Sequence, residues 1–240
     1  MAWAASAFAV PIFSLFVLLR LTNSRTVTRV SHLLEDVRAL RVNESTRADV
    51  EEIVRRHGGG AVDGIYRGVC PKGGPAYSVR IQSDEGWIGR KASFLGLFGP
   101  EEWSVQARFK VEDGRLCFAE FQVRDSLARG VQGSLAIDAS VASNRSYPHW
   151  EGSAYGVGLR AVHNVHNLSA MITDGATKEQ RERAFDFDLS CLSRIGGCRG
   201  ACELMPSVWV DYQKEAHANG WPLPPEEAND PHCRKLEDAR

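Results

Sequence analysis

Hydrophobic and polar residues alternate in several ways along the chain, and each pattern predicts a different element. The first nineteen residues carry no charged side chain, and Arg20 ends this hydrophobic run. A helix needs about 20 mostly apolar residues to cross the hydrocarbon core of a bilayer. Residues 1–21 therefore predict an uncleaved transmembrane signal-anchor. A cleaved signal peptide is the alternative, but no basic residue precedes the run and residues 20–23 form a poor cleavage site.

Two amphipathic helices are predicted after this run. Residues 26–40 place apolar side chains three and four positions apart, which is typical of a helix with one buried face. Residues 47–57 follow a Ser–Thr pair that can cap a helix, and consecutive glycines end the segment. We expect residues 22–57 to form juxtamembrane helices that pack on the domain.

Beyond Gly60 the apolar positions recur at every second residue, which is the period of a strand with one buried face. The pair Asp113-Gly114 separates two such runs and is a strong hairpin signal. A helix that starts at Thr177, with Gln180 as its capping-box partner, is expected to run to Ile195. The strand candidates cover residues 61–70, 76–83, 103–112, 115–124, 131–142, 156–165 and 168–173.

These patterns together predict an α+β fold. It has an N-terminal transmembrane helix, two helices, an antiparallel meander sheet of about six strands and a closing C-terminal helix. The sheet and the closing helix occupy residues 58–206. Residues 207–240 contain a proline-rich stretch and a charged end, so we expect an irregular or briefly helical tail.

Composition narrows the class of partner only slightly. The chain has 29 basic and 30 acidic residues, so it lacks the strongly basic surface that is typical of nucleic-acid binding. Hydrophobic residues make up 43% of the chain, as expected for an ordinary globular domain. The membrane, contacted through residues 1–21, is the partner that the pattern itself indicates.

Two features disagree about the side of the membrane on which the domain lies. Arg20, Arg25 and Arg29 follow the hydrophobic run and no basic residue precedes it, which favours a cytoplasmic domain. The six cysteines, an even number, favour disulfides and therefore export. We expect an extracytoplasmic, periplasmic domain, because a misplaced start codon would remove the basic residues that normally precede such a run. The cytoplasmic side is the alternative.

The cysteines form one local pattern, Cys191-x6-Cys198-x3-Cys202. A turn at Gly196-Gly197 can bring Cys191 and Cys198 within the Cα separation that a disulfide requires. Zinc binding is the first alternative, although a second ligand pair at zinc-site spacing is missing. Free buried thiols are the second alternative, and they are expected if the domain is cytoplasmic.

No set of residues forms a coherent catalytic site, and no cofactor is indicated. His163 and His166 are the best local metal pair, with His149 as a further candidate. Residues three apart on a strand point to opposite faces, so we expect structural histidines at these positions. A metal-dependent hydrolase that uses His163 and His166 is the alternative. Segment 86–100 interleaves glycine with large apolar residues, and it can close the sheet or form a binding lip with Trp87, Phe94, Leu97 and Phe98.

Residues 40–59 carry a recognisable local pattern. The run Leu40-Arg41-Val42-Asn43-Glu44-Ser45-Thr46-Arg47-Ala48-Asp49-Val50, ending at His57-Gly58-Gly59, resembles the opening helix of outer-membrane assembly lipoproteins of the SmpA/OmlA type. That resemblance implies helices packed on a short antiparallel sheet and a scaffold role in envelope complexes. The whole chain also resembles uncharacterised membrane-anchored α+β proteins of soil bacteria, a resemblance that implies no activity.

The function predicted from these observations is a non-enzymatic one. We expect a single-pass membrane-anchored protein whose domain binds a protein partner, or acts as a scaffold, in the bacterial envelope. The prediction depends on the hydrophobic run, the well-patterned sheet and the lack of a coherent catalytic set.

Overall fold

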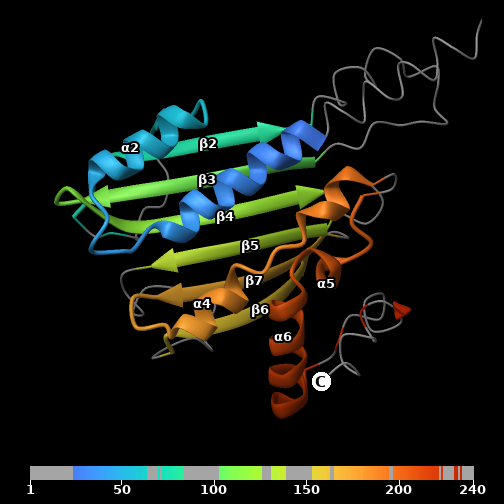
Figure 1. The fold of residues 1–240 in the computed structure, drawn as a ribbon. Helices are drawn as coiled ribbons and strands as arrows, with labels where there is room; N and C mark the ends of the chain where they lie inside the picture. The colour runs from blue at the N-terminus through green and yellow to red at the C-terminus, as the bar shows by residue number, and fades with distance from the viewer. Residues whose placement is uncertain are drawn as a thin grey trace, which may run out of the picture.

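The protein is known from a computed structural model, which describes residues 24–63, 70, 72–83, 103–125, 131–138, 153–162, 165–194, 197–221, 223, 230, 231 and 233. These residues form two layers, a sheet and a set of helices that lie on one of its faces (Figure 1). The hydrophobic run at residues 1–21 lies outside the described residues. Within the described ranges, no helix is long and apolar enough to cross a membrane.

The sheet has seven strands in the order β1-β2-β3-β4-β5-β7-β6. Neighbouring strands are antiparallel except for β5 and β7, which run parallel to each other. The strands are β1 (Gly60–Val62), β2 (Ala76–Gln82), β3 (Trp103–Glu112), β4 (Arg115–Asp125), β5 (Val131–Asp138), β6 (Tyr155–Val162) and β7 (Val165–Thr173).

The prediction of an antiparallel meander is therefore wrong, because the sheet is mixed. After β5 the chain skips one position, forms β6 at the edge of the sheet, and returns as β7 between β5 and β6. The alternation of apolar residues in a strand shows which side chains it buries, but it does not show the direction of the neighbouring strand. The hairpin expected at Asp113-Gly114 is present, and both residues have a positive φ, as a tight β3–β4 turn requires.

The helical layer also includes one short 3₁₀ turn. Its members are a helix over residues 24–39, α2 (Arg47–Arg56), α4 (Lys178–Ala184), the 3₁₀ turn (Leu189–Ser193), α5 (Ala201–Leu204) and α6 (Pro206–Asn219). Two capping boxes start the helices as the sequence suggests. The side chain of Thr46 accepts a hydrogen bond from the backbone N–H of Asp49, and that of Thr177 accepts one from Gln180.

The predicted closing helix is too long. It ends at Ala184 and not at Ile195, because Phe185 takes the C-cap position. The side chain of Asp188 then accepts from the backbone N–H of Ser190 and starts the separate 3₁₀ turn. Short polar side chains such as Asp favour caps over helix interiors, which explains why the helix does not continue through this segment.

The predicted tail contains a buried helix, α6. The helix begins with Pro206 and ends at Gly220, which has the left-handed conformation that favours glycine. Its buried residues lie on most sides of the helix, so it lacks the single apolar stripe that reveals a helix in a sequence. These buried residues are Ser207, Val208, Trp209, Val210, Tyr212, Gln213 and Ala216.

The core lies between the sheet and the helices. Its largest fully buried side chains include Trp209 from α6, Phe109 from β3 and Phe121 from β4. The corrected fold class is a mixed seven-stranded sheet with a single layer of helices, and it has no membrane-spanning helix in the described ranges.

All six cysteines are paired. The disulfides join Cys70 to Cys117, Cys191 to Cys198, and Cys202 to Cys233. The presence of disulfides agrees with the sequence, and the 191–198 pair is the one that the local spacing suggests. Because each cysteine sulfur is bonded to another cysteine sulfur, no thiolate is left to bind zinc.

Candidate functional site

The two faces of the sheet have opposite character. The helix-covered face is apolar, with Val105, Ala107 and Phe109 of β3 buried in the core. The opposite face carries mostly polar side chains, because the residues between these apolar positions are serine, glutamine, arginine and lysine. This second face, formed by alternate residues of β2 to β7, is called the polar face below.

Polar groups continue from strand to strand across the polar face. Gln106 of β3 is the register partner of Gln122 in β4, and Gln122 is the partner of Ser134 in β5. Ser134 in turn pairs with Ser169 of β7. Directly opposite residues on one face lie close enough for their side chains to interact. The polar face is therefore one continuous array and not a set of separate positions.

Hydrogen bonds connect the β2, β3 and β4 part of this array. The Nε2 of Gln106 donates to Oγ of Ser78 at 3.1 Å, and Nη2 of Arg108 donates to Oε1 of Gln106 at 2.7 Å. Arg108 also donates through Nη1 to Oε2 of Glu120 at 3.2 Å. The Arg108 and Glu120 side chains are 28% and 15% exposed, so this ion pair is partly shielded from water and its geometry is well defined.

The β5, β6 and β7 part is more deeply buried. The hydroxyl of Ser134 donates to Oδ1 of Asn167 at 3.1 Å, and that of Ser169 donates to the carbonyl oxygen of Gly158 at 3.0 Å. Gln132 is also buried on this side. Each buried serine hydroxyl is thus hydrogen-bonded, as folded proteins require.

An apolar cluster closes one end of the polar face. The disulfide between Cys70 and Cys117 packs there with Phe118 and Ala136. The ammonium group of Lys110, which is buried, donates to the carbonyl oxygen of Cys70 at 3.4 Å. The disulfide therefore fixes one border of the array.

The described side chains of the polar face offer several kinds of hydrogen-bonding group. They are amides, hydroxyls, a carboxylate, guanidinium groups and the ammonium group of Lys110. Mixed donors and acceptors in fixed positions can recognise a polar surface.

A second polar cluster joins the helices to the edge of the sheet. Arg183 of α4 forms a bidentate ion pair with Asp211 of α6, from Nε to Oδ2 at 2.7 Å and from Nη2 to Oδ1 at 2.5 Å. The hydroxyl of Tyr155, in β6, donates to the same Oδ2 at 2.7 Å. Burial and this bond to Asp211 raise the pKa of the Tyr155 phenol well above its ordinary value. Because every member bonds to another member, the cluster holds three elements together and presents no reactive group.

Most residues proposed from the sequence as site residues lie outside the described part. These are His149, His163, Trp87, Phe94, Leu97 and Phe98. His166 belongs to β7, but its side chain is not among those described. Within the described residues, no group of three or more His, Cys, Asp and Glu side chains could hold a metal ion. The hydrolase alternative therefore stays an untested prediction.

The polar face is the feature that sequence reasoning missed. Its residues occupy the polar positions of the alternating runs, which usually indicate a solvated surface. The turn of the β3–β4 hairpin does not predict the pairs on this face either. The register shifts between Lys110 and Val111, and only after this irregularity does Arg108 lie opposite Glu120 and Gln106 opposite Gln122. The polar-face residues of β5 and β7 could not be predicted from the sequence. Their alignment depends on the parallel pairing of these two strands, which the alternation of apolar residues does not reveal.

Comparison with known proteins gives no further assignment: no family model, no curated protein and no solved structure matches the chain. The resemblance of residues 40–59 to lipoproteins of the SmpA/OmlA type stays a prediction.

Proposed function

We propose that the protein is a non-catalytic, extracytoplasmic binding domain that holds a protein partner against the polar face of its sheet. The observation that carries this proposal is the continuous array from Ser78 to Ser169, in which donors and acceptors are fixed by mutual hydrogen bonds. A partner that offers backbone and polar side-chain groups can match such an array without a change in its geometry.

The extracytoplasmic location is supported by the cysteines. Three disulfides and no free thiol are typical of proteins in oxidising compartments, and cytosolic proteins rarely keep such bonds. In this proposal the hydrophobic run at residues 1–21, of which the first nineteen are uncharged, directs the export of the chain.

Site-specific photo-crosslinking in the cells that make the protein tests the binding surface. A photoreactive amino acid replaces Arg124, an exposed residue of β4, in one version of the full chain, and replaces Lys214, an exposed residue of α6, in the control. We expect a discrete protein adduct at position 124 and none at position 214. Equal labelling at both positions, or no adduct at position 124, would contradict the proposal.

A second variant tests whether the polar array itself binds the partner or whether the partner only lies close to position 124. Glu120→Gln removes the negative charge of Glu120 from the array while it keeps the size of the side chain, and it leaves Arg124 untouched. We expect this change to weaken the adduct formed at position 124, because charge-assisted hydrogen bonds depend on the carboxylate. An adduct of unchanged yield would mean that the polar array takes no part in binding.

A further inference from the structure

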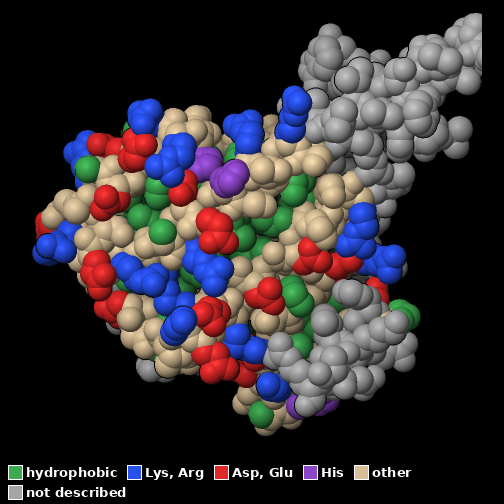
Figure 2. Space-filling view, viewed as in Figure 1, with side chains coloured by type: hydrophobic (Ala, Val, Ile, Leu, Met, Phe, Trp, Pro, Cys, Tyr) green, Lys and Arg blue, Asp and Glu red, His purple; other side chains and the backbone are tan. Residues whose placement is uncertain are grey.

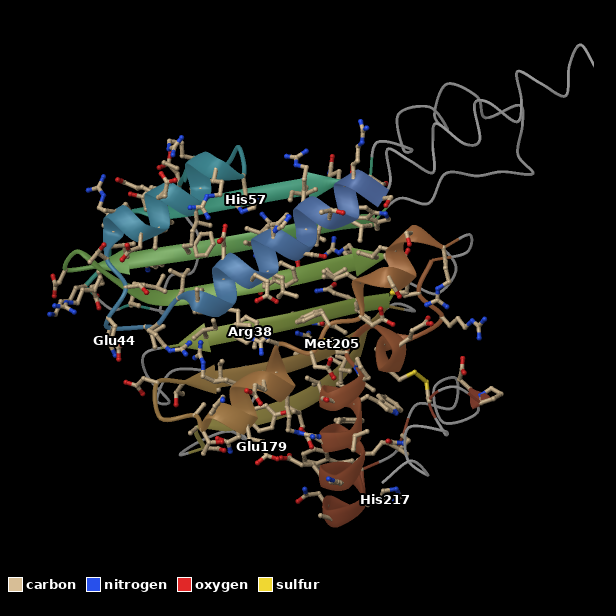
Figure 3. All side chains as sticks on the ribbon, in the orientation of Figure 1. Arg38, Glu44, His57, Glu179, Met205 and His217 are labelled. Carbon is tan, nitrogen blue, oxygen red and sulfur yellow. A yellow bond between two sulfur atoms is a disulfide. The ribbon has the colours of Figure 1, made fainter. Side chains whose placement is uncertain are left out.

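The side chains of Arg41 and Arg181 meet at the C-terminal end of the helix over residues 24–39, where the charge of Arg38 also acts on Arg181. Nη2 of Arg181 donates to the carbonyl oxygens of Arg38 at 3.3 Å and Leu40 at 3.1 Å. Nη1 of Arg41 donates to the same two oxygens, at 3.2 Å and 3.4 Å. Because they share both acceptors, the guanidinium groups of Arg41 and Arg181 lie side by side. Figure 3 labels Arg38 in this region, between the N-terminal helix and α4.

The positive charges in this cluster repel one another. Burial and, to a smaller extent, the charges of Arg41 and Arg38 lower the pKa of the Arg181 guanidinium to about 10, while the charge of Glu44 opposes them. The side chain of Arg181 also packs over the ring of Phe185 at 5.7 Å, which limits its freedom to turn away. The cluster is thus a fixed group of like charges.

Carboxylates within the described part of the chain do not neutralise the cluster. Arg38 has one exposed ion pair, with Glu35 at 3.6 Å, and the described residues give Arg41 and Arg181 no ion pair at all. Each of these two guanidinium groups uses one nitrogen on the shared carbonyls, which leaves N–H groups without an acceptor in the described structure. Figure 2 shows basic side chains gathered over this part of the surface, with acidic ones around them.

Helix capping explains only part of this arrangement. A basic side chain near the last carbonyl groups of a helix is favourable, because the helix dipole is negative there. A second guanidinium on the same two carbonyls adds repulsion and no new acceptor. Arg183, on the same helix as Arg181, is different, because the carboxylate of Asp211 balances its charge in a bidentate ion pair.

We propose that Arg41 and Arg181, with Arg38 beside them, bind a phosphate group. The planar guanidinium group matches phosphate oxygens in a bidentate manner. A phosphate carries more than one negative charge near neutral pH, so it balances several arginines better than a single carboxylate does. The phosphate belongs either to a small soluble molecule or to a lipid headgroup. This site lies on the helical side of the molecule and is separate from the polar face.

Equilibrium dialysis of the full chain against radiolabelled inorganic phosphate tests the site. We expect one phosphate per chain and a loss of affinity of about tenfold or more in Arg41→Gln and in Arg181→Gln, since each change removes charge-assisted hydrogen bonds. Arg199→Gln is the matched control, because Arg199 is exposed and lies outside the cluster, and it should bind phosphate like the original chain. Should Arg181→Gln fail to fold, the exposed Arg41 still decides the question.

Vesicles of phosphatidylcholine with and without phosphatidic acid identify the source of the phosphate. Binding to vesicles that contain phosphatidic acid, lost in Arg41→Gln and kept in Arg199→Gln, assigns the site to a lipid headgroup. Binding of inorganic phosphate alone assigns it to a soluble molecule. The proposal fails if the original chain binds neither probe, or if Arg41→Gln binds both as well as the original chain does.

Discussion

Single residues decide how firmly the helices are attached to the sheet, and Asp211 is the clearest case. Its carboxylate takes hydrogen bonds from Arg183 and Tyr155, so one residue of α6 connects α4 and β6. The Arg183 and Asp211 side chains are only 18% and 15% exposed. Loss of one member of such a shielded pair leaves the other charge without compensation.

Asp211→Asn should therefore lower the free energy of unfolding by about 3 kcal/mol. Glu182→Gln on the same helix as Arg183 is the control, because the Lys178–Glu182 pair is exposed at 91% and 51% and contributes little. Urea unfolding of both variants measures the difference. Equal effects of the two changes would show that the cluster does not hold the elements together.

Tyr155 makes the stability of the fold sensitive to alkaline pH. Its raised pKa means that the folded state keeps the phenol protonated above the pH at which the unfolded chain ionises. Below about pH 10 the phenol makes its full contribution to the free energy of unfolding. Above this pH the contribution falls by at most about 1.4 kcal/mol per pH unit. As the pH is raised above 10, the measured free energy of unfolding should therefore fall more steeply for the original chain than for Tyr155→Phe. Parallel curves would contradict this expectation.

At the scale of elements, α6 is a structural part of the core. Trp209 is fully buried, and its ring lies 5.9 Å from that of Tyr212 on the same helix. Trp209→Ala should destabilise the protein by about 3–5 kcal/mol, because a large buried side chain is lost and a cavity is left. Lys214→Ala, an exposed change on the same helix, should have little effect. Thermal unfolding of the two variants distinguishes a core helix from a tail.

Local signals predicted some elements well and others poorly. The start of α2 at Thr46, the start of α4 at Thr177 and the turn at Asp113-Gly114 follow from neighbouring residues, so the sequence reveals them. The Arg183–Asp211 pair joins residues 28 positions apart on different helices, and no local pattern indicates it. The polar face has the same limitation, because its residues become neighbours only through the register of the sheet.

At the scale of the whole molecule, the disulfides tie distant parts of the chain together. The Cys70–Cys117 bond spans 47 positions, whereas the Cys191–Cys198 bond spans 7. In the chain-entropy model, loss of the longer link costs about 4 kcal/mol and loss of the shorter one about 2 kcal/mol. Paired Cys→Ala variants, compared by chemical unfolding without reductant, should show this order. The reverse order would mean that strain or residual structure outweighs loop length.

The topology of the sheet also determines the order in which the molecule can assemble. Strands β1 to β5 pair with their neighbours in sequence, so that this part of the sheet can form from local contacts. The β5–β7 pair instead joins residues 35 positions apart, as in Val131 and His166, because β6 comes between the two strands in the sequence but lies beyond β7 in the sheet. Non-local pairing of this kind slows folding. We therefore expect late docking of the β6–β7 hairpin to be the slow step of folding, and a chain arrested before that step would expose the edge of β5 to aggregation.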